Sequence, residues 1–130
     1  MPLHRLYMLA LGLFLLPACH QSRPLLPGLD TVAWSRDPYA CQNQRATQVT
    51  GFLRAKEQLY GSTTATIEDL LGRPDEEERA EQTEKTYYYY LEPGSQCEPG
   101  HRRSGANKLS IHFGALGTVT EILTERPLRN

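Results

Sequence analysis

The sequence predicts an α+β domain in which two helices pack on one face of a three-stranded antiparallel sheet. Two segments with apolar residues at helical spacing come first, and three segments of aromatic or alternating residues follow in the last third of the chain. A short turn bounded by glycines joins the last two of these segments, which is typical of a hairpin. Helices grouped before strands favour a helical layer over an antiparallel sheet.

Composition limits the size of the protein and the kind of partner. The chain has 130 residues, enough for one small domain, and its 14 Lys and Arg residues balance 15 Asp and Glu residues. Because a nucleic-acid binder usually needs an excess of cations to neutralise phosphates, this balance argues against nucleic acid as the partner. It also argues against a strongly acidic disordered tail.

The N-terminus has the layout of an export signal. A weakly basic start, residues 1–5, precedes the uncharged run 6–16, which is too short for a membrane span of about 20 residues. The run ends in Leu-Pro-Ala-Cys at 16–19, which resembles the lipobox of bacterial lipoproteins. We therefore predict a signal peptide over 1–18 and lipidation of Cys19, with ordinary secretion as the alternative.

Acyl chains on Cys19 would hold the protein on a membrane of the bacterial cell envelope, since each buried methylene contributes about 0.8 kcal/mol. The following residues include Pro24, Pro27 and Gly28 and show no periodic pattern. We therefore expect residues 19–34 to be a lipidated N-terminus and a flexible tether. The folded domain is expected over 35–130.

Two further cysteines, Cys41 and Cys97, are expected to form a structural disulfide. An exported location favours an oxidised pair, and a cross-link of this span contributes about 4 kcal/mol in the chain-entropy model. The alternatives are a free or redox-active pair and a metal site. The sequence contains no Cys-x-x-Cys, and no histidine is spaced as a zinc ligand near either cysteine.

A first helix is expected over about 38–58. Asp37 can accept hydrogen bonds from the first turn, and Pro38 suits the first helical position. Gly51 weakens this helix locally by up to about 1 kcal/mol. Arg45 is among the polar residues outside the apolar stripe, which consists of Ala46, Val49, Phe52, Leu53 and Leu59.

A shorter second helix follows, with Ser62 or Thr63 as its cap and Gly72 followed by Pro74 as its end. Its apolar face consists of Ile67, Leu70 and Leu71. The next segment, 75–84, is rich in charge and has no apolar stripe. We expect it to be a solvated connection.

The three strands are expected at 86–91, 109–113 and 118–124. The first is aromatic, and the second alternates apolar and polar residues as a strand with one buried face does. The short segment 114–117 forms the hairpin turn between the last two strands. Residues 92–107, rich in proline and glycine, form a long surface loop pinned by Cys97.

The segment 61–122 resembles the BamE-like (SmpA/OmlA) family of small outer-membrane lipoproteins. Each shared motif is short, and their order and spacing carry the resemblance. With the lipobox at Cys19 they cover roughly half the chain. The motifs are Gly61 with Thr63, Ile67 and Leu71-Gly72-x-Pro74, Tyr87 to Tyr90, Leu109-x-Ile111-x-Phe113, and Gly117-x-Val119.

This resemblance implies two helices on a three-stranded sheet, anchored at the outer membrane and facing the periplasm. The best-known members of the family are accessory subunits of the machine that inserts β-barrels into that membrane. The same fold occurs in secreted inhibitors of β-lactamase. The expected function is therefore a non-enzymatic, protein-binding envelope lipoprotein, an accessory factor in outer-membrane assembly or maintenance, with a hydrolase inhibitor as the alternative.

The sequence contains no constellation for catalysis, a metal or a cofactor. There is no Ser/His/Asp order, HExxH, glycine-rich phosphate loop or calcium loop. His20 lies in the expected tether, His101 in the long loop, and His112 in a strand where alternation points it to solvent. Glu76, Glu77 and Glu78 are successive residues and cannot converge on one point. We therefore expect no enzymatic activity, and no small-molecule substrate is evident.

The run Tyr87 to Tyr90 has two faces. Because strand side chains alternate, Tyr87 and Tyr89 face one way, and Tyr88 and Tyr90 face the other. One pair can belong to the core. The other is either covered by the long loop or exposed as a binding surface.

The long loop also carries a small basic cluster at 101–103. This cluster is either solvated or contacts lipid headgroups or an acidic partner. The candidate partner surface therefore consists of Tyr88, Tyr90, Arg102 and Arg103.

Overall fold

The computed structural model describes residues 23–81 and 83–128. In these residues three α-helices, three short 3-10 helices and four strands follow one another along the chain. In order they are α1 (Thr31–Ser35), η1 (Pro38–Ala40), α2 (Val49–Ala55), η2 (Lys56–Leu59), α3 (Thr64–Leu71), β1 (Glu76–Arg79), β2 (Lys85–Tyr90), η3 (Ser95–Cys97), β3 (Lys108–Phe113) and β4 (Val119–Thr124).

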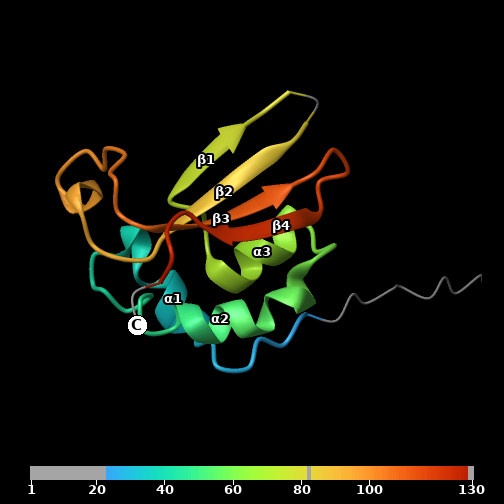
Figure 1. Cartoon of the computed structure of the whole chain (residues 1–130), viewed down its shortest axis with the longest axis horizontal. Helices are drawn as coiled ribbons and strands as arrows, with labels where there is room; N and C mark the ends of the chain where they lie inside the picture. Colours follow the sequence, from blue (N-terminus) through green and yellow to red (C-terminus); the bar gives the residue numbers. More distant parts are fainter. Residues whose placement is uncertain (1–22, 82, 129–130) are drawn as a thin grey trace, which may run out of the picture.

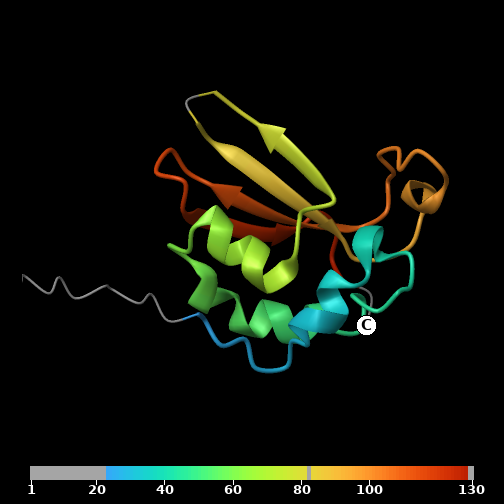
Figure 2. The ribbon, with the colours of Figure 1, turned by 180° about the vertical axis from the view of Figure 1, so that it is seen from behind.

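The strands form one antiparallel sheet in the order β1-β2-β3-β4, so neighbours in the sheet are neighbours along the chain. The α-helices lie on one side of this sheet, and no helix of residues 23–81 and 83–128 covers its other side (Figures 1 and 2). The α+β class predicted from the sequence is confirmed. The sheet has four strands rather than three, and the helical layer has three α-helices rather than two.

The additional strand, β1, comes from the charged segment 75–84, which was expected to be a solvated connection. β1 pairs with β2 in the register Glu76↔Tyr88 to Arg79↔Lys85. Three of its four residues are exposed, so no apolar pattern marks it in the sequence. Charged residues are a common way to keep an edge strand from pairing with another chain. The expectation for this segment was wrong because an edge strand beyond the core needs no apolar face.

The helix expected over 38–58 is interrupted. Residues 38–40 form only η1, and the α-helix begins at Val49. Tyr39, Ala40 and Asn43 have positive φ values of 59°, 56° and 55°, which a right-handed helix does not allow. The segment instead wraps around the buried carboxylate of Asp37, which accepts hydrogen bonds from the amides of residues 42, 44 and 45 at 2.7, 2.8 and 3.3 Å.

The folded part also begins earlier than the expected residue 35. Asp30 caps α1, because its Oδ1 accepts hydrogen bonds from the amides of Val32 and Ala33 at 3.0 and 2.9 Å. Trp34 is completely buried and Leu26 is 8% exposed. The part of the expected tether from Leu26 onward therefore belongs to the domain.

The second helix matches its expectation closely. Thr63 caps α3 through its Oγ1, which accepts from the amide of Thr66 at 3.3 Å. Gly72, with φ of 78°, ends it. Its apolar face packs into a core shared by the helices and the inner face of the sheet. Prominent members of this core are Trp34, Phe52, Leu59, Ile67, Leu71, Tyr87, Tyr89, Ile111, Phe113 and Ile122.

Candidate functional site

Two of the predictions for the N-terminus lie outside the described residues: the signal peptide 1–18 and the lipidation of Cys19. Within the described part of the chain, every helix is too short or too polar to cross a bilayer. The described residues therefore carry the candidate site, and the anchor remains a prediction.

The predicted disulfide between Cys41 and Cys97 is confirmed, with an S–S distance of 2.04 Å. It joins the end of η1 to η3 and so holds the loop 92–107 against the segment after α1. The same contact is reinforced by Gln96, which is buried and donates from Nε2 to the carbonyl oxygens of Tyr39 and Glu92, both at 2.9 Å.

The four consecutive tyrosines alternate between the two faces of the sheet, as predicted. Tyr87 and Tyr89 point toward the helices and are 2% and 0% exposed. Their hydroxyl groups donate to Glu68 Oε1 at 2.5 Å and to the carbonyl oxygen of Gly72 at 3.0 Å. Burial raises the pKa of both side chains well above the usual range, and for Tyr87 the Glu68 hydrogen bond adds to this effect.

The other tyrosine pair divides in two. Tyr90 is completely buried, because the loop 92–107 and Tyr39 cover it, and the amide of Ser104 donates to its hydroxyl oxygen at 3.0 Å. Tyr90 is therefore removed from the candidate partner surface. Tyr88 remains half-exposed, and its hydroxyl donates to Glu78 at 3.0 Å. Burial and this hydrogen bond raise the pKa of Tyr88.

Tyr88 lies near the centre of the sheet face that the helices leave open, here called the outer face. Cross-strand pairing places Tyr88, Ser110 and Leu123 in one row across β2, β3 and β4. Ser110 is buried between its neighbours, whereas Leu123 is 46% exposed. An aromatic and an aliphatic side chain thus share an accessible surface.

A buried cation supports this surface. The Lys108 ammonium lies 5.2 Å from the ring centre of Tyr88 and 5.1 Å from that of Tyr90. It is 3.3 Å from a Glu76 carboxylate oxygen, and Glu76 also accepts from the Tyr90 hydroxyl. These contacts fix the tyrosine rings, so the outer face needs little reorganisation to bind a partner.

The long loop contributes one of its arginines to the outer face. Arg103 Nε lies 3.4 Å from Glu76 Oε2, and the side chain is 62% exposed. Arg102 is exposed in the same loop. His101 stacks on Tyr39 with ring centres 4.1 Å apart, so it belongs to the packing of the loop rather than to a basic cluster on the surface.

His112 lies on the outer face, in a row with Thr86 and Glu121. Its Nδ1 is 3.0 Å from Thr86 Oγ1, and its Nε2 is 3.9 Å from Glu121 Oε2. A catalytic triad needs a carboxylate that hydrogen-bonds the ring and fixes its orientation. At 3.9 Å the Glu121 carboxylate does not do so. In the described residues no group of three or more His, Cys, Asp or Glu side chains could hold a metal ion.

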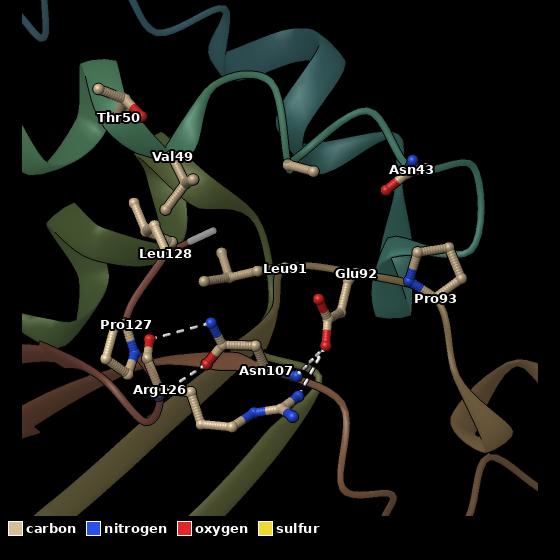
Figure 3. A pocket seen from close by; sticks show the side chains of 11 residues that line it. Asn43, Val49, Thr50, Leu91, Glu92, Pro93, Asn107, Arg126, Pro127 and Leu128 are labelled. Atoms are coloured by element: carbon tan, nitrogen blue, oxygen red, sulfur yellow. Dashed lines mark hydrogen bonds and ion pairs between the residues drawn. The ribbon is translucent and has the colours of Figure 1, made fainter. Parts of the chain in front are cut away.

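A recess of about 640 Å³ opens where the chain leaves β4, and no sequence pattern indicates it (Figure 3). Its apolar lining includes Val49, Leu91 and Leu128. On the polar side, Glu92 Oε1 accepts from Arg126 Nη2 at 2.7 Å and from the backbone amide of Asn107 at 3.0 Å. These groups bond one another across long sequence separations, which is why no local pattern marks them. The network holds the C-terminal segment in place.

Comparisons with known proteins assign neither a family nor a function to the chain. No protein-family model matches the chain, and neither a curated protein nor a solved structure matches it significantly. The open outer face around Tyr88, with Leu123, Arg103 and His112, is therefore the candidate functional site on structural grounds alone.

Proposed function

We propose that the chain is a non-enzymatic envelope lipoprotein whose folded domain binds another protein through the outer face of its sheet. One observation carries this proposal. Among the described residues no helix covers the outer face, yet Tyr88 and Leu123 share it in a row that spans all four strands. A large aromatic ring that is already held in place is a typical anchor of a protein interface.

The charges of the outer face indicate the chemistry of the partner. Glu78, Glu121 and Glu125 are exposed on or beside it, whereas Arg103 is the exposed cation, and Glu76 and Lys108 neutralise each other. A complementary surface therefore offers an apolar patch for Tyr88 and Leu123 with lysine or arginine at its rim. Such charge pairing mainly steers encounter and sets specificity.

The location of this function comes from the N-terminal sequence. The lipobox at Cys19 and the BamE-like motifs support anchoring at the outer membrane with the domain facing the periplasm. On this basis the partner is an envelope protein, and the role is that of an accessory factor in outer-membrane assembly or maintenance. Cys19→Ala should release the protein from membranes; retention on membranes would contradict the anchor.

Site-specific photo-crosslinking tests the binding surface. A photoreactive amino acid at position 88 should capture an envelope partner from solubilised membranes, with barrel-assembly components expected. The same amino acid at Glu57, exposed on the helical side, is the control and should capture none. Tyr88→Ala should abolish co-purification of that partner, whereas Glu57→Ala should leave it unchanged. Equal capture from both positions would contradict the proposal.

One observation favours the alternative, a hydrolase inhibitor. The loop 92–107 projects beyond the end of the sheet and is held by the Cys41–Cys97 disulfide, so it is preorganised for insertion into a cleft (Figure 1). The two functions differ in what is recovered. Capture of a soluble hydrolase from a photoreactive group at Arg102, together with no capture from position 88, would support the inhibitor.

A further inference from the structure

The folded domain begins very close to the predicted anchor. Arg23 already donates from its guanidinium to the carbonyl oxygen of Asp69, and Leu26 is buried in the core. Only residues 20–22 separate Arg23 from Cys19. Four successive Cα steps span at most roughly 14 Å. If Cys19 is lipidated, as the proposed function holds, the point where the chain enters the domain cannot lie far from the bilayer.

That entry point belongs to one particular end of the molecule. Arg23 and Pro24 line a hollow together with Tyr60, which precedes the cap of α3. The segment after Tyr60 is in turn bonded to the start of β4, since the amide of Gly61 donates to the carbonyl oxygen of Val119 at 3.0 Å. The β3–β4 turn therefore lies at the same end as residue 23 (Figures 1 and 2).

The same end carries most of the exposed apolar side chains. Five large hydrophobic residues of the described chain are exposed, and three of them, Leu25 at 80%, Tyr60 at 38% and Leu116 at 92%, lie here. Leu116 is at the tip of the β3–β4 turn, where it has no core to pack against. Apolar and tyrosine side chains at protruding positions are suited to the interfacial region of a bilayer.

We propose that this anchor-proximal end, defined by Leu25, Tyr60 and Leu116, rests directly on the membrane surface. The partner here is a lipid surface, and the charge of this end of the protein determines which headgroups suit it. Thr83 at the tip of the β1–β2 hairpin donates to the carbonyl oxygen of Ala115 at 3.0 Å, which brings the acidic hairpin tip, with Glu81 and Glu84, to this end. The surface therefore suits zwitterionic headgroups better than strongly anionic ones.

This orientation determines where the other features of the molecule lie relative to the bilayer. The strands run away from the bilayer, so the loop 92–107 lies at the far end of the sheet, because it follows the end of β2 opposite to the hairpin tips. Arg102 and Arg103 then do not contact the anchoring bilayer. The outer face stands beside the membrane, where an envelope protein can reach it without displacing lipid.

Fluorescence quenching by lipid tests the orientation. The full lipidated protein carrying Leu116→Trp or Leu25→Trp is reconstituted in phosphatidylcholine vesicles with brominated acyl chains, and Leu123→Trp on the outer face is the control. All three positions are exposed, Leu123 the least at 46%, and the native Trp34 is a buried background. Emission from positions 116 and 25 should be lost relative to vesicles without bromine, whereas emission from position 123 should persist.

The outcomes separate this inference from the proposed function. Vesicle flotation is measured on the same samples. The proposed orientation is wrong if the protein floats but none of the tryptophans is quenched. It is also wrong if the protein floats and position 123 is quenched as strongly as the others. In both cases flotation still supports the lipid anchor. If the wild-type protein does not float, the prediction of a lipid anchor is wrong, and so is the orientation that depends on it.

Discussion

Arg45 and Asp75 form a buried ion pair, with Nη1 and Oδ2 2.5 Å apart and side chains that are 1% and 2% exposed. Arg45 also donates to the carbonyl oxygens of Trp34 and Tyr90 at 3.1 and 3.2 Å. Asp75 accepts from the amides of Tyr39 and Tyr90, both at 2.8 Å. The pair therefore ties the segment before α2 to β2 and to the residue that precedes β1.

Removing one member of this pair should destabilise the protein strongly. Arg45→Met leaves the Asp75 carboxylate buried without its cation, and the expected loss is about 3–5 kcal/mol in the free energy of unfolding. Urea denaturation followed by circular dichroism measures it. Arg54→Met, at an exposed position in α2, is the matched control and should change stability by less than about 0.5 kcal/mol.

The double variant Arg45→Met with Asp75→Leu distinguishes a buried charge from lost packing. It should be more stable than Arg45→Met alone, because no uncompensated charge remains. Equal losses for the single and double variants would show that the charge is not the cause.

The interior position of Arg45 was not predictable from local sequence. A helical period over 38–58 places it among the polar residues, and its partner lies 30 positions further along the chain. By contrast, the N-cap and C-cap of α3 and the alternation of Tyr87 to Tyr90 depend on neighbouring residues, and these expectations agree with the structure. The place of Tyr88 on the face away from the helices follows from this alternation, whereas burial of Tyr90 depends on the course of a distant loop.

The disulfide should stabilise the domain and order the long loop. Cys41→Ser combined with Cys97→Ser removes a cross-link between residues 56 apart in sequence. The expected loss is about 2–4 kcal/mol in the free energy of unfolding, together with faster amide exchange over residues 92–107. Hydrogen exchange followed by mass spectrometry gives both readouts. Unchanged exchange in the loop would mean that the hydrogen bonds of Gln96 suffice to hold it.

The tyrosines of β2 should make the fold sensitive to alkali. Burial raises the pKa of Tyr87, Tyr88, Tyr89 and Tyr90 above that of a tyrosine in the unfolded chain, which is about 10. The folded state thus holds protons that the unfolded state releases. The stabilising contribution of these tyrosines is therefore complete below about pH 10 and decreases as the pH rises toward their pKa values in the folded state.

Urea denaturation between pH 8 and pH 11.5 checks this slope. Tyr89→Phe, which removes the most deeply buried of the ionisable hydroxyls, should decline less steeply over this range than the wild type does. Stability that stays constant up to pH 11 in the wild type would contradict the assignment of the raised pKa values to the folded state.

Gly51 tests where the domain begins. Helix propensity alone predicts that Gly51→Ala in α2 stabilises by up to about 1 kcal/mol. In the structure, however, a Cβ at this position would lie 2.8 Å from the carbonyl oxygen of Gly28, whose φ is 84°. Because the obstacle is backbone, the clash can be relieved only by shifting the segment that leads into α1. Gly51→Ala should therefore destabilise, by about 1–3 kcal/mol.

Thr50→Ala, exposed one residue earlier in the same helix, is the control and should be neutral or slightly stabilising. If Gly51→Ala were instead as favourable as this control, the chain around Gly28 would not pack on α2 in solution. Residues 26–34 would then behave as the free tether that the sequence suggests, and the short reach between Cys19 and the domain would no longer hold. The sign of this one stability difference thus decides between a domain held close to the membrane and a domain that a longer flexible tether separates from it.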